Sequence, residues 1–85
     1  MFEIVKSVVD EWNPYELLPN APSDEYDSET IKISQIINKS SNVVEIADII
    51  SRVFSKSFNE NLDIQKCVKP AEKIYELLNK HKNIK

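Results

Sequence analysis

The absence of glycine constrains the fold of this 85-residue chain more than any other feature. Phosphate-binding loops and dinucleotide-binding turns need backbone with no side chain close to the phosphate, so sites of that kind are excluded. Tight β-hairpins also favour glycine in left-handed conformations, which argues against a hairpin-rich fold. The chain has eight asparagines, and asparagine tolerates a positive φ better than most residues. We therefore expect asparagine wherever the backbone is left-handed.

Apolar residues recur every three or four positions, which is the spacing of one face of a helix. In the first segment the repeat consists of Phe2, Val5, Val8 or Val9, and Trp12. Pro14 is expected to end this helix, because the residue before a proline is pushed out of the helical region. Asn13 and Pro14 then predict a short helical turn over 14–18, which Pro19 and Pro22 would stop.

The second helix is predicted to begin after Asp27. Asp27 is the expected N-cap, and Tyr26 and Ile31 are placed as a hydrophobic staple. The expected core face of this helix consists of Thr30, Ile33, Ile36 and Ile37. A loop is expected over 39–41.

Asn42 and Glu45 have the spacing of a capping box, which predicts the start of the clearest helix in the chain. Its apolar stripe consists of Val43, Ile46, Ala47, Ile50, Val53 and Phe54, with Phe58 as a candidate to extend it and Ile49 beside it. Asp48 and Arg52 lie four residues apart, a spacing that permits a weak ion pair.

The last helix has two possible starts. Its apolar stripe consists of Ile64, Cys67, Val68, Ala71, Ile74, Tyr75 and Leu78, and Pro70 interrupts it. The helix either begins near Lys69 with Pro70 in its first turn, or begins near Ile64 and bends at Pro70. We favour the earlier start, because the stripe is otherwise a coincidence. The chain is thus predicted to form one domain over 1–85: an all-α, compact bundle of four helices with a short extra helical turn after the first.

The composition excludes several kinds of site. Cys67 and His81, each the only residue of its type, would lie about 20 Å apart along one helix, too far for a catalytic pair. Transition-metal sites need more such ligands, and the acids over 24–29 do not match a calcium-binding EF-hand loop. We expect no catalytic residue, cofactor or metal. The single cysteine, and the lack of a long apolar run, predict a cytoplasmic protein that does not cross a membrane.

The charges are unevenly distributed. Residues 1–30 carry eight acids and one base (−7), whereas residues 31–85 carry ten bases and six acids (+4). The net charge of −3 disfavours nucleic acid as a partner. Aromatic residues and acids gather in the segment 12–29, where tyrosine and tryptophan beside acids suit a protein-binding surface. The candidate interaction surface consists of Trp12, Tyr15, Asp24, Glu25, Tyr26, Asp27 and Glu29.

The same segment resembles the YugE-like family of small, uncharacterised bacterial proteins, in which a first helix ends in Trp-Asp-Pro and Glu-Tyr-Asp-x-Glu follows. The matching residues are Trp12, Pro14, Glu25, Tyr26, Asp27 and Glu29. Asn13 replaces the usual aspartate, which retains a capping oxygen but removes a charge. The likeness extends over most of the chain, including the helices after Asn42 and Pro70. The resemblance implies a helical domain of unknown function.

These observations favour a non-catalytic protein-interaction domain that binds another protein with a basic surface. The alternative is an immunity-type inhibitor whose acids cover the basic cleft of a nuclease-like toxin. A small acid-based or metal-dependent enzyme ranks third. The residues do not identify the partner, the biological process or the oligomeric state.

Overall fold

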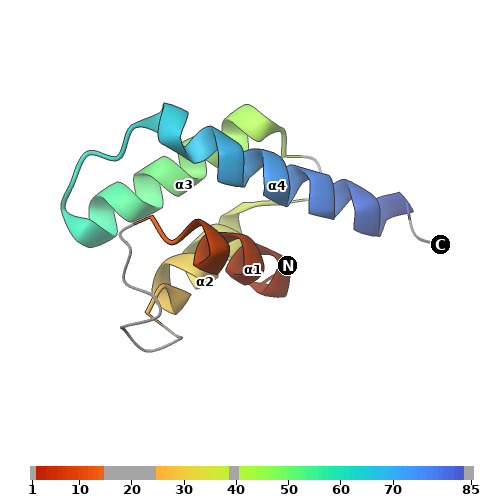
Figure 1. Cartoon of the computed structure of the whole chain (residues 1–85), viewed down its shortest axis with the longest axis horizontal. Coiled ribbons are helices and arrows are strands. Elements are labelled where there is room, and N and C mark those ends of the chain that lie inside the picture. The colour runs from red at the N-terminus through yellow and green to blue at the C-terminus, as the bar shows by residue number, and fades with distance from the viewer. Residues whose placement is uncertain (1, 15–24, 39–40, 84–85) are drawn as a thin grey trace.

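Four helices form a bundle in the structure, a computed structural model that describes residues 2–14, 25–38 and 41–83 (Figure 1). The helices are α1 (Phe2–Trp12), α2 (Asp27–Ile36), α3 (Val43–Phe58) and α4 (Ile64–Asn83). The described residues contain no strand, so the predicted all-α fold is confirmed. Helix α1 packs against α2 and α4, and α3 packs against the same two helices. None of the helices in these ranges is long and apolar enough to cross a bilayer.

Asparagine occupies the left-handed positions, as the lack of glycine predicts. Within the described ranges, the residues with positive φ are Asn13 (47°) and Asn59 (53°). Asn13 follows α1 and its N–H donates to the carbonyl of Val9 at 2.8 Å. Asn59 is the C-cap of α3 and its N–H donates to the carbonyl of Ser55. The predicted turn over 14–18 lies outside the described residues, apart from Pro14.

The start of α2 differs from the prediction. Tyr26 occupies the N-cap without a capping side-chain bond, and Asp27 is the first helical residue. The carboxylate of Asp27 instead accepts a hydrogen bond from Lys6 Nζ at 2.6 Å. The prediction that Asp27 caps the helix is therefore wrong, because an ion pair between helices engages its side chain and the buried Tyr26 takes the cap position.

The inner face of α2 is narrower than predicted. Thr30, Ile33 and Ile37 are buried as expected. Ile36, which the prediction placed in the core, is 55 % exposed, and Ile31, predicted to form a staple with Tyr26, is 45 % exposed. The prediction for Ile36 is wrong, because α2 contacts the rest of the bundle along a narrower stripe than its isoleucine content suggests. The staple of Tyr26 and Ile31 stays a prediction.

The capping box that opens α3 is confirmed. The N–H of Glu45 donates to Asn42 Oδ1 at 2.8 Å, and the N–H of Asn42 donates to Glu45 Oε1 at 2.9 Å. The weak ion pair expected on the outer face is also present, with 3.1 Å between Arg52 Nε and Asp48 Oδ2. Local residues thus specify both the start of α3 and its outward face.

Replacing Asn42 with alanine should lower the free energy of unfolding by about 1 kcal/mol, because the N–H of Glu45 loses its acceptor at an exposed helix end. Asn42→Gly is the matched variant: glycine favours the same position, so its cost should be only a few tenths of a kcal/mol. Urea unfolding followed by circular dichroism measures both. Equal stability of the alanine variant and the parent would show that the box contributes nothing.

Helix α4 begins at Ile64 and continues through Pro70, which confirms the earlier of the two predicted starts (Figure 1). Asp63 lies just before it, and its Oδ1 accepts the N–H of Gln65 at 3.0 Å. Of the predicted stripe, Cys67, Ala71, Ile74 and Leu78 are buried. A bend at Pro70 stays a prediction.

The core is centred on Phe54 of α3, which is fully buried. Its ring lies edge-on to Trp12, with centroids 5.7 Å apart, and to Tyr26, at 6.0 Å. Phe58 stacks on it at 5.9 Å. Around this aromatic group pack the buried aliphatic residues of all four helices: Val5, Val8, Val9, Ile33, Ile37, Ile46, Ala47, Ile50, Ala71, Ile74 and Leu78, together with Cys67.

Candidate functional site

The strongest candidate for a binding site is a groove of about 260 Å³ between α1 and α4, called the Trp12 groove below. It is lined by Ser7, Val8, Glu11, Trp12, Lys69, Pro70, Lys73 and Leu77. Trp12 is half-buried at the end of α1, and its contact with Phe54 fixes the plane of the indole. A partner that enters this groove meets an aromatic side chain already held by the core.

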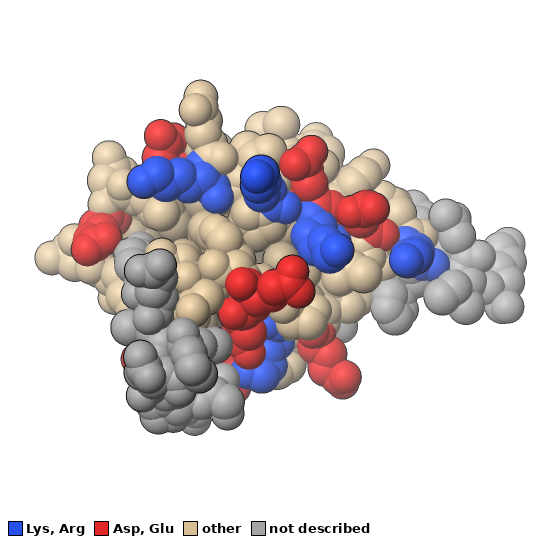
Figure 2. All heavy atoms as spheres, in the orientation of Figure 1, with Lys and Arg blue, Asp and Glu red and all other residues tan. Residues whose placement is uncertain are grey.

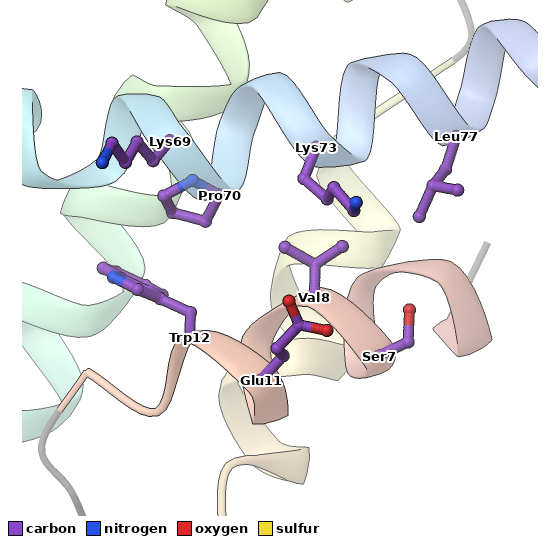
Figure 3. Close-up of a pocket in the computed structure, with 8 residues that line it drawn as sticks. All are labelled: Ser7, Val8, Glu11, Trp12, Lys69, Pro70, Lys73 and Leu77. Carbon is purple, nitrogen blue, oxygen red and sulfur yellow. The ribbon is translucent and has the colours of Figure 1, made fainter.

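The two walls of the Trp12 groove carry opposite charges. Basic side chains form a row over α4, with acidic side chains along its upper edge, and further acidic side chains lie below the row over α1 (Figure 2). Figure 3 shows Glu11 on the α1 wall and Lys69 and Lys73 on the α4 wall. Within the described part of the chain, these three side chains form no ion pair closer than 4.0 Å with each other or with another residue. Their charges therefore remain available to a ligand.

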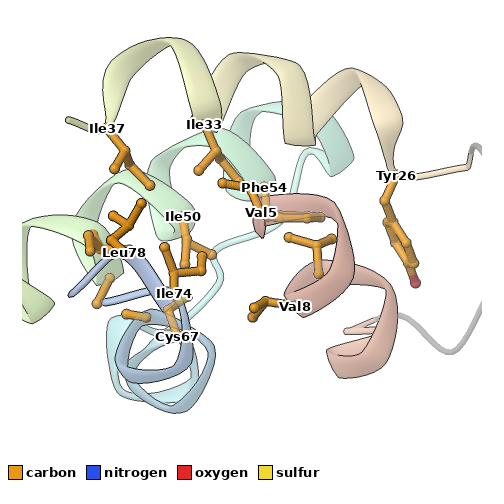
Figure 4. Packing of buried hydrophobic residues seen from close by; sticks show 14 residues of the cluster. Val5, Val8, Tyr26, Ile33, Ile37, Ile50, Phe54, Cys67, Ile74 and Leu78 are labelled. Carbon is orange, nitrogen blue, oxygen red and sulfur yellow. The ribbon is translucent and has the colours of Figure 1, made fainter. Parts of the chain in front are cut away.

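Tyr26 and Glu29 do not belong to the accessible surface that the sequence predicted. Tyr26 is 0 % exposed and is one of the buried residues drawn in Figure 4. Its O–H donates to Asn13 Oδ1 at 2.7 Å. Glu29 is 7 % exposed. The prediction placed both residues on the surface, although both lie along the inner face of α2. Tyr26 precedes Thr30 by four residues and Ile33 by seven, so it continues the buried stripe of the helix. Glu29 lies beside that stripe. This spacing is the signal that the sequence prediction overlooked.

The other predicted surface residues have different surroundings. Glu25 is exposed, Trp12 lines the groove, and Asp27 is only partly exposed. Tyr15 and Asp24 lie outside the described residues. The structure therefore places Trp12 and Glu25 where a partner can reach them.

Lys6 neutralises part of the acidic N-terminal region. Its Nζ lies 3.0 Å from Asp10 Oδ2 and 2.6 Å from Asp27 Oδ1, so it joins α1 to α2. These hydrogen bonds, first that with Asp27 and then that with Asp10, raise the pKa of Lys6 above its ordinary value. Among the described residues, the exposed acids of this region without an ion pair are Glu3, Glu11 and Glu25. Of the acids in this region that the structure describes, Asp10 and Asp27 are paired and Glu29 is buried, so these three contribute little to the accessible acidic surface.

A second groove, of about 300 Å³, lies between α2 and α3. It is lined by Lys32, Gln35, Ile36, Arg52, Val53 and Lys56. Ile36 and Val53 were predicted to lie in the core, Arg52 was predicted only to pair with Asp48, and Lys32 and Lys56 were given no role. The signal was present at helical spacing, since Lys32 and Ile36 lie four residues apart, as do Arg52 and Lys56.

Cys67 has the properties of a core residue. It is fully buried, and its Sγ donates a weak hydrogen bond to the carbonyl of Asp63 at 3.6 Å. Burial, with a smaller effect of the Asp63 carboxylate, raises the pKa of the thiol to about 11. The thiol is therefore protonated at neutral pH, which is unfavourable for a nucleophile.

The described residues contain no group of three or more His, Cys, Asp and Glu side chains arranged to hold a metal ion. The side chain of His81 lies outside them.

One comparison with known proteins gives a match. The model of the family described as "Domain of unknown function (DUF1871)" matches residues 3–83. No curated protein and no solved structure matches the chain.

Proposed function

Because the chain belongs to the DUF1871 family of domains of unknown function, we propose a role from its surface: a non-catalytic, cytoplasmic domain that binds another protein at the Trp12 groove. The observation that carries the proposal is a half-buried tryptophan beside unpaired charges in an open groove. We also propose membership of the YugE-like group, on the motif formed by Trp12, Pro14 and Glu25–Glu29.

The aromatic side chain supplies the first argument. Tryptophan is enriched among the residues that contribute most to binding energy at interfaces. Trp12 is held edge-on to Phe54 at 5.7 Å, so little conformational entropy remains to be lost when a partner covers it. Val8 and Leu77 extend the apolar floor on either side of the groove. An apolar side chain of the partner would pack there.

The charges supply the second argument, because they define the polarity of the partner. Glu11, on the α1 wall, favours basic residues of the partner on the α1 side. Lys69 and Lys73 favour acidic residues on the α4 side. The proposed partner therefore presents a basic surface to α1 and an acidic rim to α4, and this polarity would fix its orientation.

An immunity-type inhibitor of a basic, nuclease-like toxin is the second candidate. The exposed, unpaired acids Glu3, Glu11 and Glu25 favour it, since they could cover a basic cleft. The lysines on the α4 wall of the groove would repel a partner that is basic over its whole surface. We therefore rank this function below the first.

Photo-crosslinking from the groove tests the proposal. A photoreactive amino acid replaces Ser7, which is exposed and lines the groove, or Glu60, which is exposed and lines neither groove. We expect a protein of the native host to crosslink from position 7 and not from position 60. Mass spectrometry then identifies it: a nuclease would support the inhibitor function, and a regulatory or metabolic protein would support the first.

Two charge-reversal variants serve as matched tests of that crosslink. Glu11→Lys with Glu25→Lys should lower its yield by about tenfold, because it reverses the acid on the groove wall and a second exposed acid that would attract a basic partner. Glu72→Lys with Glu76→Lys changes the net charge equally on an exposed part of α4 outside both grooves, and should leave the yield unchanged. Equal crosslinking from positions 7 and 60, or equal losses in both double variants, would contradict the proposal.

A further inference from the structure

We propose that the groove between α2 and α3 is a second docking site, and that its occupant is an acidic segment of another protein with apolar anchor residues. This site is separate from the Trp12 groove, whose walls carry both charges, whereas the charged side chains that line this groove are basic. The inference does not depend on the function proposed above, because none of its lining residues belongs to the Trp12 groove.

The floor of the groove is apolar and open to solvent. Ile36, in the last turn of α2, is 55 % exposed, and Val53 of α3 is half-buried next to it in the groove lining. An isoleucine with more than half its surface in water leaves apolar area that a partner can bury favourably. Two aliphatic side chains on different helices thus provide a floor for an apolar anchor.

The rim of the groove is basic. Lys32 of α2 and Lys56 of α3 are exposed, and neither has an ion pair among the described residues. Arg52 is a third cation, which holds its own neighbour Asp48 through Nε at 3.1 Å. Among the residues that the structure describes, no acidic side chain lines the groove.

Charge complementarity therefore selects the occupant. Carboxylates of an acidic segment would pair with the two lysines, while a basic segment would be repelled by all three cations. Each single exposed pair is weak, so the apolar floor must supply part of the affinity. The occupant must combine acids with aliphatic residues, as an amphipathic acidic helix does.

The arrangement of the helices allows both grooves to be occupied at once. Each helix packs against two neighbours in the order α1, α2, α3, α4 and back to α1. The boundary between α2 and α3 is therefore opposite the boundary between α1 and α4. One chain could connect two partners with different charges.

The probe is a 15-residue amphipathic peptide labelled with fluorescein. It has leucines on one face and glutamates around them. Fluorescence anisotropy should show saturable binding to the whole chain. Lys32→Glu with Lys56→Glu should weaken it by at least about tenfold. Ile36→Gln, at an exposed position that tolerates a polar side chain, should weaken it several-fold. Lys66→Glu with Lys80→Glu changes the net charge equally outside both grooves and should weaken it less than about twofold.

Circular dichroism confirms that each variant is folded before binding is compared. Amide chemical-shift changes on adding the probe should occur at residues 32–36 and 52–56. Equal losses of affinity in the two double variants would overturn the proposal, and so would chemical-shift changes along α1 and α4. A dissociation constant above about 1 mM for the parent would overturn it as well. Sedimentation of the chain alone tests whether the occupant is a second copy of the chain. If the parent self-associates and the variant with Lys32→Glu and Lys56→Glu does not, the groove binds a second copy and the proposal is overturned.

Discussion

Replacing Phe54 with alanine is expected to lower the free energy of unfolding by about 3–5 kcal/mol, the usual cost of deleting a large core aromatic. The ring is fully buried and contacts Trp12, Tyr26 and Phe58. Removing it would leave a cavity where three other rings meet. A chain of this length has a total stability of roughly 4–13 kcal/mol, so the variant would be close to unfolding.

Urea unfolding followed by circular dichroism measures the loss of unfolding free energy, and tryptophan fluorescence shows whether the environment of the core rings has changed. Trp12 is the only tryptophan, and its indole lies edge-on to Phe54, so its emission should shift to longer wavelength in the variant. Phe54→Leu keeps most of the volume and should cost about 1.5 kcal/mol or less. A Phe54→Ala variant that melts within about a degree of the parent would mean that the four rings do not form the centre of the core.

Cys67 is expected to be almost unreactive in the folded chain. With a pKa of about 11, roughly one thiol in a thousand is ionised at pH 8, and the side chain is buried. Unfolding returns the thiol to its ordinary pKa of 9.0, where roughly one in ten is ionised. Alkylation by iodoacetamide at pH 8 should therefore be at least about a hundredfold slower in native buffer than in 8 M urea.

The same pKa makes the fold less stable in alkali. Between pH 9 and about pH 11 the unfolded chain has lost the thiol proton while the folded chain retains it. The unfolded state then binds fewer protons, so the free energy of unfolding falls as the pH rises. The full loss above pH 11 amounts to roughly 2–3 kcal/mol for a shift of this size.

Cys67→Ala is the control for the loss of stability in alkali, because lysines and tyrosines titrate in the same pH range. Its free energy of unfolding, measured in urea from pH 8 to pH 11, should fall less steeply than that of the parent. Identical slopes, or equal alkylation rates in native buffer and in urea, would show that the thiol is accessible in the folded state.

The helices could be predicted where their signals lie within one or two turns. The capping box of Asn42 and Glu45 specifies the start of α3, since both bonds join residues three positions apart. The unbroken apolar stripe from Ile64 identified the start of α4 in spite of Pro70. Asparagine at the left-handed positions 13 and 59 follows from the lack of glycine.

The candidate site could be predicted only in part. Trp12 was identified, because the gathering of aromatic residues and acids over 12–29 is a local pattern. The α4 wall was not: Lys69 and Lys73 are far from Trp12 in sequence, and only packing brings them together. The groove between α2 and α3 was missed because the helical spacing of Ile36 from Ile33 placed it on the core face, whereas packing leaves it exposed.

By itself, then, the sequence determined the helices of this protein and the positions where asparagine ends them, because both depend on backbone conformation and on neighbours a few residues away. Only the tertiary structure decided which polar and aromatic residues a partner can reach. Tyr26 is buried and Asp27 pairs with Lys6, 21 residues away, because α1 packs across the start of α2. Burial and ion pairing between helices depend on distances in space, which the order of the residues along one helix does not contain.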